Sequence, residues 1–233
     1  MQYLELLIVC VAVILAGIAL GNAAVYLFNR MPTQWFCDYD QNKVAEIPDF
    51  PYTQRIKSYP WKFIFSMFFI SMGIYLAVRD PWFAAAALLL MWLMVELSIG
   101  DVLYKIIPDQ LLILISVTAL GFLKYNQGWQ DMAAGAAIGF GITGLTALMG
   151  KLAYGRETLG GGDIKLFTAL GLVLGMGGIL AVFLLSTLFS AGHFVILLAE
   201  KKIKMHDSRP MAPYIAAAVF VYVTFLWHIW LRV

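Results

Sequence analysis

The sequence predicts an all-α, polytopic integral membrane protein with about eight transmembrane helices. Of its 233 residues, 62% are hydrophobic and only 13% are charged, and the mean hydropathy is +0.82. Soluble domains are roughly half apolar and a quarter charged, so one globular core could not bury this much apolar surface. Since a membrane-spanning helix needs about 20 apolar residues, the length allows roughly eight spans with short connections.

Composition excludes several other classes of protein. The net charge of +2 is too small for the electrostatic footprint of a nucleic-acid-binding protein, so the expected surroundings are a lipid bilayer and no nucleic acid. The two cysteines, Cys10 and Cys37, belong to no Cys-x-x-Cys pair. The sequence therefore predicts neither a metal site nor a disulfide framework.

Apolar runs bounded by charged residues, Pro and Gly place the helices in order along the chain. They are predicted at about 4–28, 61–78, 82–100, 110–125, 131–153, 163–176, 178–199 and 211–231. The stretch 163–199 is too long for one straight span, and Gly175, Gly177 and Gly178 offer a tight turn that divides it. In the fifth helix, closely spaced small residues predict close helix packing, at Gly135, Gly139, Gly141 and Gly144.

The Lys and Arg residues predict the orientation, because they are enriched in cytoplasmic loops. With the N-terminus outside, 13 of the 16 basic residues fall on the inner side, and only Arg79, Lys124 and Arg232 fall outside. An odd number of spans would break this alternation, which supports the division near Gly177. Residues 1–233 are expected to form a single transmembrane domain with a short cytoplasmic loop at 29–60.

Two aspartates are predicted to meet at the inner membrane surface. Asp101 ends the third helix in ELSIGDVLYKIIPDQL, and Asp163 begins the sixth in ETLGGGDIKL, 62 residues later. Placing an ionisable side chain at the edge of the membrane is energetically unfavourable, so such residues indicate a function. Two carboxyl groups that face one water molecule can share a proton, one acting as base and the other as acid. A carboxylate is favoured at the start of a helix and disfavoured at its end, so Asp163 is predicted to be the base and Asp101 the acid.

Three glycines, Gly160, Gly161 and Gly162, directly precede Asp163. They have no side chains that would block an extended peptide or the partner carboxylate. A glycine-rich loop before a helix also occurs at phosphate sites. Here no Gly-Lys-Ser/Thr follows and Asp163 would repel phosphate, so the peptide interpretation is favoured.

These motifs resemble the type IV prepilin peptidases, a family of membrane aspartic endopeptidases. Gly160-Gly161-Gly162-Asp163 has the GxGD pattern, and Asp101 and Ile107-Pro108-Asp109 precede it in the family's order. The resemblance extends to four other places along the chain, Gly21-Asn22, Arg30-Met31-Pro32, Glu157 and Pro210-Met211-Ala212-Pro213. Presenilin-type and signal-peptide-peptidase-type proteases share GxGD but are less similar, because Gly100 rather than Tyr precedes the first aspartate.

The resemblance implies a prepilin leader peptidase in the inner membrane, in which Asp101 and Asp163 activate the water that attacks a peptide carbonyl. The expected substrates are prepilins or pseudopilins of type IV pilus assembly or protein secretion. They would be cut at the cytoplasmic face, between a short basic leader and a hydrophobic N-terminal helix. No cofactor is expected for the proteolysis.

Many members of the family also N-methylate the new N-terminus, and these carry two Cys-x-x-Cys pairs after the first span. The corresponding loop of this chain, 29–60, holds Cys37 alone, which is too few thiolates for a zinc site. S-adenosylmethionine is therefore expected as a cofactor only if methylation is retained.

Supporting roles are predicted for further residues near the aspartates. Asp109 follows Pro108 and is expected to cap the fourth helix, and it is also the alternative to Asp101 as the first catalytic residue. Glu157 either hydrogen-bonds the glycines or is solvated. Lys165 either tunes the aspartates or is one of the basic residues typical of an inner surface. For Glu96, in the third helix, a structural hydrogen bond is favoured over a role in the site.

Two other functions are compatible with the composition. A small proton- or cation-coupled transporter could use Asp101, Asp163 and Glu96 as a relay, but a relay needs ionisable groups across the bilayer depth. Here they cluster at one face. A structural subunit of a secretion machine would leave the paired aspartates unexplained, so the peptidase is favoured.

Overall fold

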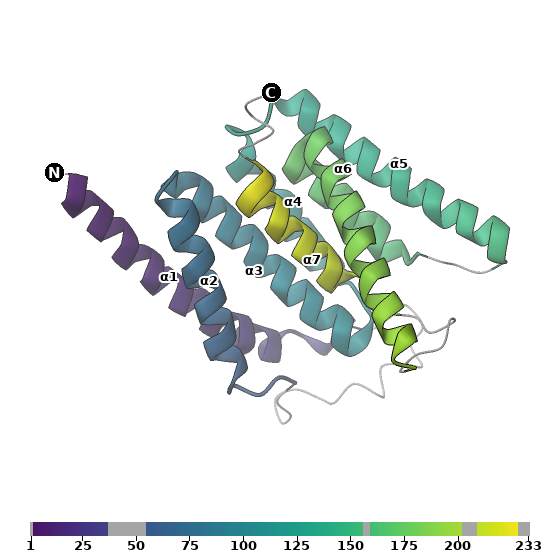
Figure 1. Ribbon diagram of the computed structural model, residues 1–233, viewed down its shortest axis with the longest axis horizontal. Helices are drawn as coiled ribbons and strands as arrows, with labels where there is room; N and C mark the ends of the chain where they lie inside the picture. The colour runs from purple at the N-terminus through teal and green to yellow at the C-terminus, as the bar shows by residue number, and fades with distance from the viewer. Residues whose placement is uncertain (1, 37–54, 156–158, 202–208, 228–233) are drawn as a thin grey trace. The chain divides into compact units, whose positions relative to one another are not determined.

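The computed structural model describes residues 2–36, 55–155, 159–201 and 209–227, and it contains no β-strand within them, so the all-α prediction is confirmed there (Figure 1). The described elements are α1 (Gln2–Arg30), the 3-10 helix η1 (Thr33–Phe36), α2 (Trp61–Ala77), α3 (Pro81–Tyr104), α4 (Asp109–Phe122), α5 (Trp129–Tyr154), α6 (Gly161–Ala199), α7 (Ala212–Val221) and the π-helical turn η3 (Tyr222–Leu226).

Four of these helices are long and apolar enough to cross a membrane, namely α1, α3, α5 and α6. Their outer surfaces are apolar as well: on α1, Leu7 is 60% exposed and Leu15 is 63% exposed. Leaving such side chains in water is unfavourable, whereas lipid tails accept them. These four helices are therefore candidate membrane spans, while the total of about eight spans and the outside N-terminus stay predictions.

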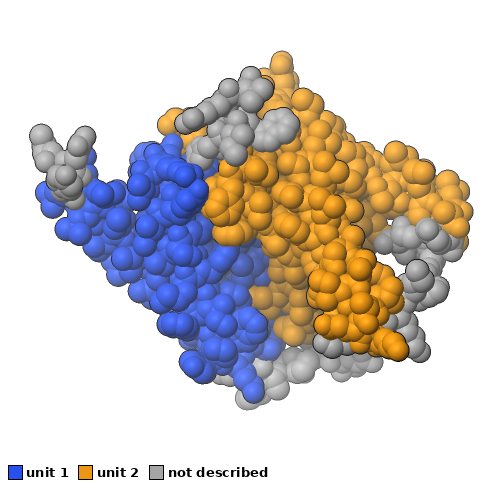
Figure 2. Space-filling model, viewed as in Figure 1, with its two compact units in different colours: residues 1–96 blue, residues 97–233 orange. Residues whose placement is uncertain are grey.

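The chain divides into two compact units, residues 1–96 and 97–233 (Figure 2). In the first unit, two glycines one turn apart allow α1 to pack closely on α2. A Cβ atom added at Gly17 would lie 2.8 Å from the backbone nitrogen of Ile70, and one at Gly21 would collide with the backbone of Ser66. Small residues spaced in this way bring membrane helices into backbone contact.

The end of α1 also holds the described part of the loop that precedes α2. The Asn29 side chain donates a hydrogen bond to the Ile56 carbonyl and accepts one from the Ile56 amide, each at 3.0 Å. Residues 37–54 of this loop, including Cys37, lie outside the described residues.

In the second unit, glycines also govern the packing of α5 on α6. A Cβ at Gly135 would collide with the backbone of Gly171, and a Cβ at Gly139 would collide with the carbonyl of Phe167. The predicted packing role is confirmed for these two glycines. It is not found for Gly141 and Gly144, where a Cβ would meet no atom of the described residues within 4 Å.

The long helix α6 is broken where the sequence predicts a turn. Gly175 has φ 72° and ψ −178°, a conformation that glycine adopts readily and other residues avoid. The rings of Phe167 and Phe183 are 5.7 Å apart, whereas about 24 Å would separate them along a straight helix. The two halves of α6 therefore fold back on each other (Figure 1).

Side chains from α5 and the α4–α5 connection satisfy the backbone groups that this break releases. Asp131 accepts a hydrogen bond from the Met176 amide at 3.1 Å, so it caps the second half of α6. The side-chain amide of Asn126 donates a hydrogen bond to the Val173 carbonyl at 3.0 Å, at the end of the first half of α6. Asp163 begins the first half of α6, twelve residues before the break.

Candidate active site

The end of α3 and the connection after it position Asp101. The helix runs to Tyr104, one turn beyond its predicted end, so Asp101 lies inside the last turn. Lys105 takes a left-handed conformation (φ 55°), and its amide bonds the Asp101 carbonyl at 2.9 Å, which closes the helix. Pro108 then begins α4 from an extended conformation that prevents the two helices from merging.

The GxGD motif forms the start of α6. The helix begins at Gly161, so two of the three glycines are helical, and the predicted loop is wrong for them. Asp163 stands in the first turn, where its amide bonds the Gly160 carbonyl at 3.1 Å. A Cβ at Gly162 would lie only 3.0 Å from the Cβ of Ile107, so this glycine lets the α3–α4 connection pack against α6.

The structure brings Asp101 and Asp163 together. The two carboxyl groups are close enough for the charge of Asp101 to act on Asp163. Asp101 is only 6% exposed, and Asp163 is half-buried. Like charges repel more strongly away from water, so a buried pair of this kind tends to hold one proton between its members. That is the protonation state that general acid and general base chemistry requires.

A third helix end contributes to the site, and sequence reasoning missed its role. The amide of Ala212, the first residue of α7, donates a hydrogen bond to Asp101 Oδ2 at 2.8 Å. The signal available in the sequence was the pair Pro210 and Pro213, since Pro is common at helix starts. The prediction that Asp101 is the acid considered only the unfavourable end of its own helix, α3. It is incomplete, because the start of α7, which favours a carboxylate, faces Asp101.

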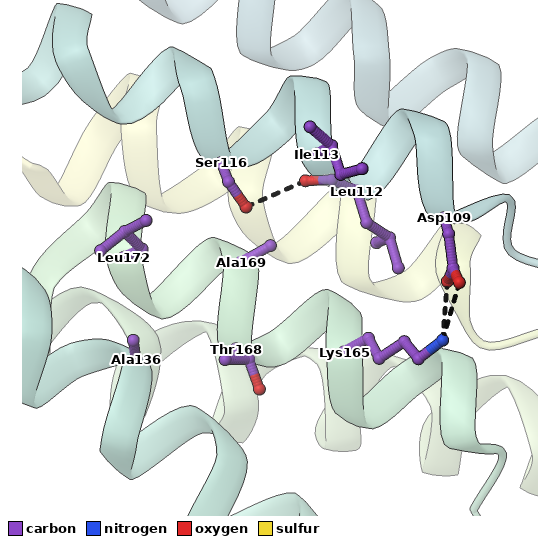
Figure 3. Close-up of a pocket in the computed structure, with 9 residues that line it drawn as sticks. All are labelled: Asp109, Leu112, Ile113, Ser116, Ala136, Lys165, Thr168, Ala169 and Leu172. Carbon is purple, nitrogen blue, oxygen red and sulfur yellow. Dashed lines mark hydrogen bonds and ion pairs between the residues drawn. The ribbon is translucent and has the colours of Figure 1, made fainter.

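Asp109 and Lys165 pair with each other. Lys165 Nζ lies 2.8 Å and 2.9 Å from the two carboxylate oxygens of Asp109, and both side chains are about half exposed (Figure 3). Lys165 follows Asp163 by two residues, which places it about 200° around α6 from Asp163. The capping role predicted for Asp109 is wrong, because Pro108 is the N-cap and no side-chain cap bond is present.

The Asp109–Lys165 pair stands at a shallow groove of about 340 Å³. Figure 3 shows the lining side chains of α4 and α6 facing each other across it. They are mostly apolar or small: Leu112, Ile113 and Ser116 on α4, and Thr168, Ala169 and Leu172 on α6, with Ala136 of α5 also lining the groove. On α6 these residues share the face of Lys165, so the groove lies away from Asp163.

The remaining predicted residues are placed as follows. Glu157 lies outside the described residues. Glu96 is fully buried in α3, and neither of its carboxyl oxygens has a hydrogen-bond partner among the described residues. The structural hydrogen bond predicted for Glu96 is thus not found in the described part of the chain.

The fold and the site together define a helical membrane protein with two adjacent carboxyl groups where α3 ends and α6 and α7 begin. Residues 87–196, which include both aspartates, match the model of the Type IV leader peptidase family. The resemblance inferred from the motifs is thereby confirmed.

Curated relatives point to the same family. The chain is 33% identical over 162 residues to a prepilin leader peptidase/N-methyltransferase of Aeromonas hydrophila, covering 65% of this chain and 53% of the relative. Proteins of the same name from Bacillus subtilis and Pseudomonas aeruginosa are each 31% identical, over 54% and 60% of this chain and 49% of each relative. The chain spans about half the length of the curated relatives it matches. No solved structure matches it.

Proposed function

We propose that this chain is a membrane aspartic endopeptidase of the GxGD type that removes the leader peptide from prepilins or pseudopilins. The observation that carries the proposal is the juxtaposition of Asp101 and Asp163, two sequence-distant carboxyl groups within the segment that matches a leader peptidase family. The names of the relatives support prepilins as the substrate class.

In the proposed reaction, the ionised aspartate removes a proton from a water molecule whose oxygen attacks the scissile carbonyl carbon. The protonated aspartate donates its proton to the carbonyl oxygen, which gives a tetrahedral diol. The C–N bond then breaks, the leaving nitrogen takes a proton from one carboxyl group, and a diol hydroxyl returns one to the other. Water is the only co-reactant, so no cofactor is required.

The cytoplasmic membrane face is the proposed location of the cleavage. With the orientation favoured by the Lys and Arg distribution, the end of α3 and the start of α6 both lie inside. A basic leader is expected to stay on that side, while the hydrophobic helix behind it enters the bilayer. Such a substrate would present its junction at the depth of the aspartates.

N-methylation is left out of this proposal. The groove between α4 and α6 has no aromatic side chain among its lining residues that would stack an adenine ring. The only cysteine of the 29–60 loop, Cys37, lies outside the described residues. No reaction step is therefore assigned to S-adenosylmethionine.

The test is direct cleavage. Purified protein in nanodiscs is incubated with a full-length prepilin, and mass spectrometry identifies the new N-terminus. We expect a single cut between the basic leader and the hydrophobic segment. A curated relative that cleaves the same prepilin under the same conditions is the positive control. If the relative cleaves the prepilin and this chain leaves it intact, the proposal is contradicted.

The glycines of the GxGD motif are predicted to have separate roles. A Cβ atom added at Gly161 would meet no atom of the described residues within 4 Å, and the position is exposed. We therefore expect Gly161→Leu to keep the thermal midpoint but raise KM several-fold by obstructing the peptide. Gly162→Ala places its new Cβ against Ile107, so we expect a lowered midpoint. Thermal unfolding and steady-state kinetics of both variants separate the two effects. A wild-type KM for Gly161→Leu would show that the peptide does not pass this glycine.

A further inference from the structure

The backbone at the start of α7 donates hydrogen bonds to the buried carboxyl group of Asp101, from Ala212 at 2.8 Å and also from the neighbouring Met211. Within the first turn, Pro213 has no N–H, and the amides of Tyr214 and Ile215 both bond the Met211 carbonyl, at 3.0 and 3.1 Å. The Ala212 amide instead donates to Asp101, 111 residues away in the sequence. The hydrogen bond between a helix-start amide and a carboxylate is charge-assisted. Such a bond is stronger and shorter than one between two neutral groups.

The same turn of α7 is held from its other side by the second half of α6. The Tyr214 hydroxyl and His193 Nδ1 are 2.6 Å apart, a hydrogen bond, and their rings are in contact at a centroid separation of 5.7 Å. Tyr214 is two residues from Ala212. The His193–Tyr214 contact therefore fixes the turn that carries the donor to Asp101.

We propose that the first turn of α7 is a positioning element of the catalytic pair: the Ala212 amide orients the Asp101 carboxylate, and the His193–Tyr214 hydrogen bond holds the turn in place. This inference rests on the proposed peptidase function. It adds a backbone group and two side chains that act through Asp101 without themselves reacting.

The physical reason lies in the geometry of the reaction. The hydrogen bond from Ala212 to Oδ2 restricts the rotation of the Asp101 carboxyl group, and so sets the direction in which Oδ1 faces the shared proton or the attacking water. A carboxyl group that rotates freely would present this oxygen only part of the time, and misplacement by about 1 Å can cost about 100-fold in rate. Because the Ala212 N–H is bonded to Asp101 and not available to a substrate, its loss should lower kcat and leave KM nearly unchanged.

The decisive experiment removes one donor, the N–H of Ala212. Ala212 is replaced by lactic acid through nonsense suppression, which converts the amide to an ester and keeps the side chain. The matched control is the same replacement at Ala217, an exposed residue in the middle of α7. We expect kcat for prepilin cleavage to fall about 10- to 100-fold at position 212, as for a lost hydrogen bond to a charged group. The control should keep a kcat within about twofold of wild type.

The outcomes separate the inference from the proposed function. If the wild-type protein cleaves prepilin and the ester at 212 has the kcat of the control, the inference is wrong and the peptidase proposal stands. If both esters lose activity equally, the loss reflects helix stability and the inference is also wrong. If the wild-type protein does not cleave, the proposed function itself fails.

A double-mutant cycle tests the second part of the proposal. His193→Phe and Tyr214→Phe each remove the hydrogen bond, so we expect each to lower kcat several-fold with little change in KM. The double variant should be no worse than either single one, because both remove the same interaction. His193→Asn, whose side-chain amide can replace Nδ1, should recover most of kcat. Additive losses, or losses that appear in KM, would contradict the positioning role.

Discussion

Asp101→Asn and Asp163→Asn are each expected to reduce kcat for leader removal by at least about 100-fold. Asn has the shape of Asp but cannot hold or transfer the proton that the pair must share. Because the change is nearly isosteric, both variants should still insert into the membrane and keep their thermal midpoints close to that of wild type. Single-turnover cleavage of a prepilin, followed by mass spectrometry, measures the loss.

Asp109→Asn is the matched control for these variants. It removes the partner of Lys165 from a half-exposed ion pair, and such pairs contribute only about 0.2–1 kcal/mol. We expect this variant to keep most of the wild-type kcat. If Asp109→Asn abolished cleavage and Asp101→Asn did not, Asp109 would be the first catalytic residue. In that case Asp109, and not Asp101, would have to lie beside Asp163 in the active enzyme.

Local sequence patterns were sufficient to predict most of the helical architecture. The apolar runs predict each described α-helix to within a few residues, because burial in lipid requires a continuous apolar stretch, but they do not predict the short 3-10 helix η1. The break in α6 was also predictable, since only a glycine-rich site fits a left-handed conformation within an apolar run, and Gly175 has that conformation. The hydrogen bonds of Asp131 and Asn126 at the break were not, because they come from other elements.

The candidate site was predictable in its two aspartates and not in what surrounds them. Hydropathy and charge predict that Asp101 and Asp163 lie at one membrane face, and this prediction is enough to suggest that they meet. The contact of Ala212 with Asp101 joins positions 111 residues apart through a backbone atom. A backbone donor has no signature in the side-chain sequence, so the role of α7 appears only when the helices are packed.

The glycines show the same limit at the level of single residues. Gly135, Gly139, Gly141 and Gly144 look alike in sequence, because small residues at short spacings are typical of helix contacts in membranes. Only the first two face α6. Which glycines pack depends on the rotation of α5 about its axis, and α5 carries no strong polar face that would reveal this rotation.

The second large effect is expected from Gly135→Ala. The new Cβ would collide with the backbone of Gly171 and lie 2.6 Å from the carbonyl carbon of Gly175. Backbone atoms cannot turn aside as a flexible side chain does, so α5 and α6 must separate. Overpacking of this kind costs about 1–3 kcal/mol and occasionally more. We therefore expect a clearly lower thermal midpoint in detergent, measured by circular dichroism at 222 nm.

Gly141→Ala, on the same helix, provides the comparison that makes this prediction specific to packing. Within the described part of the chain its Cβ would meet nothing within 4 Å, and replacing Gly by Ala inside a helix is favourable by about 1 kcal/mol in water. Its midpoint should therefore equal or exceed that of wild type. If both variants were destabilised equally, an added methyl group would destabilise α5 at either position, and the cause would not be contact with α6. No destabilisation by Gly135→Ala would mean that α5 and α6 are further apart. The first half of α6 would then lack the close support from α5 that holds Asp163 beside Asp101.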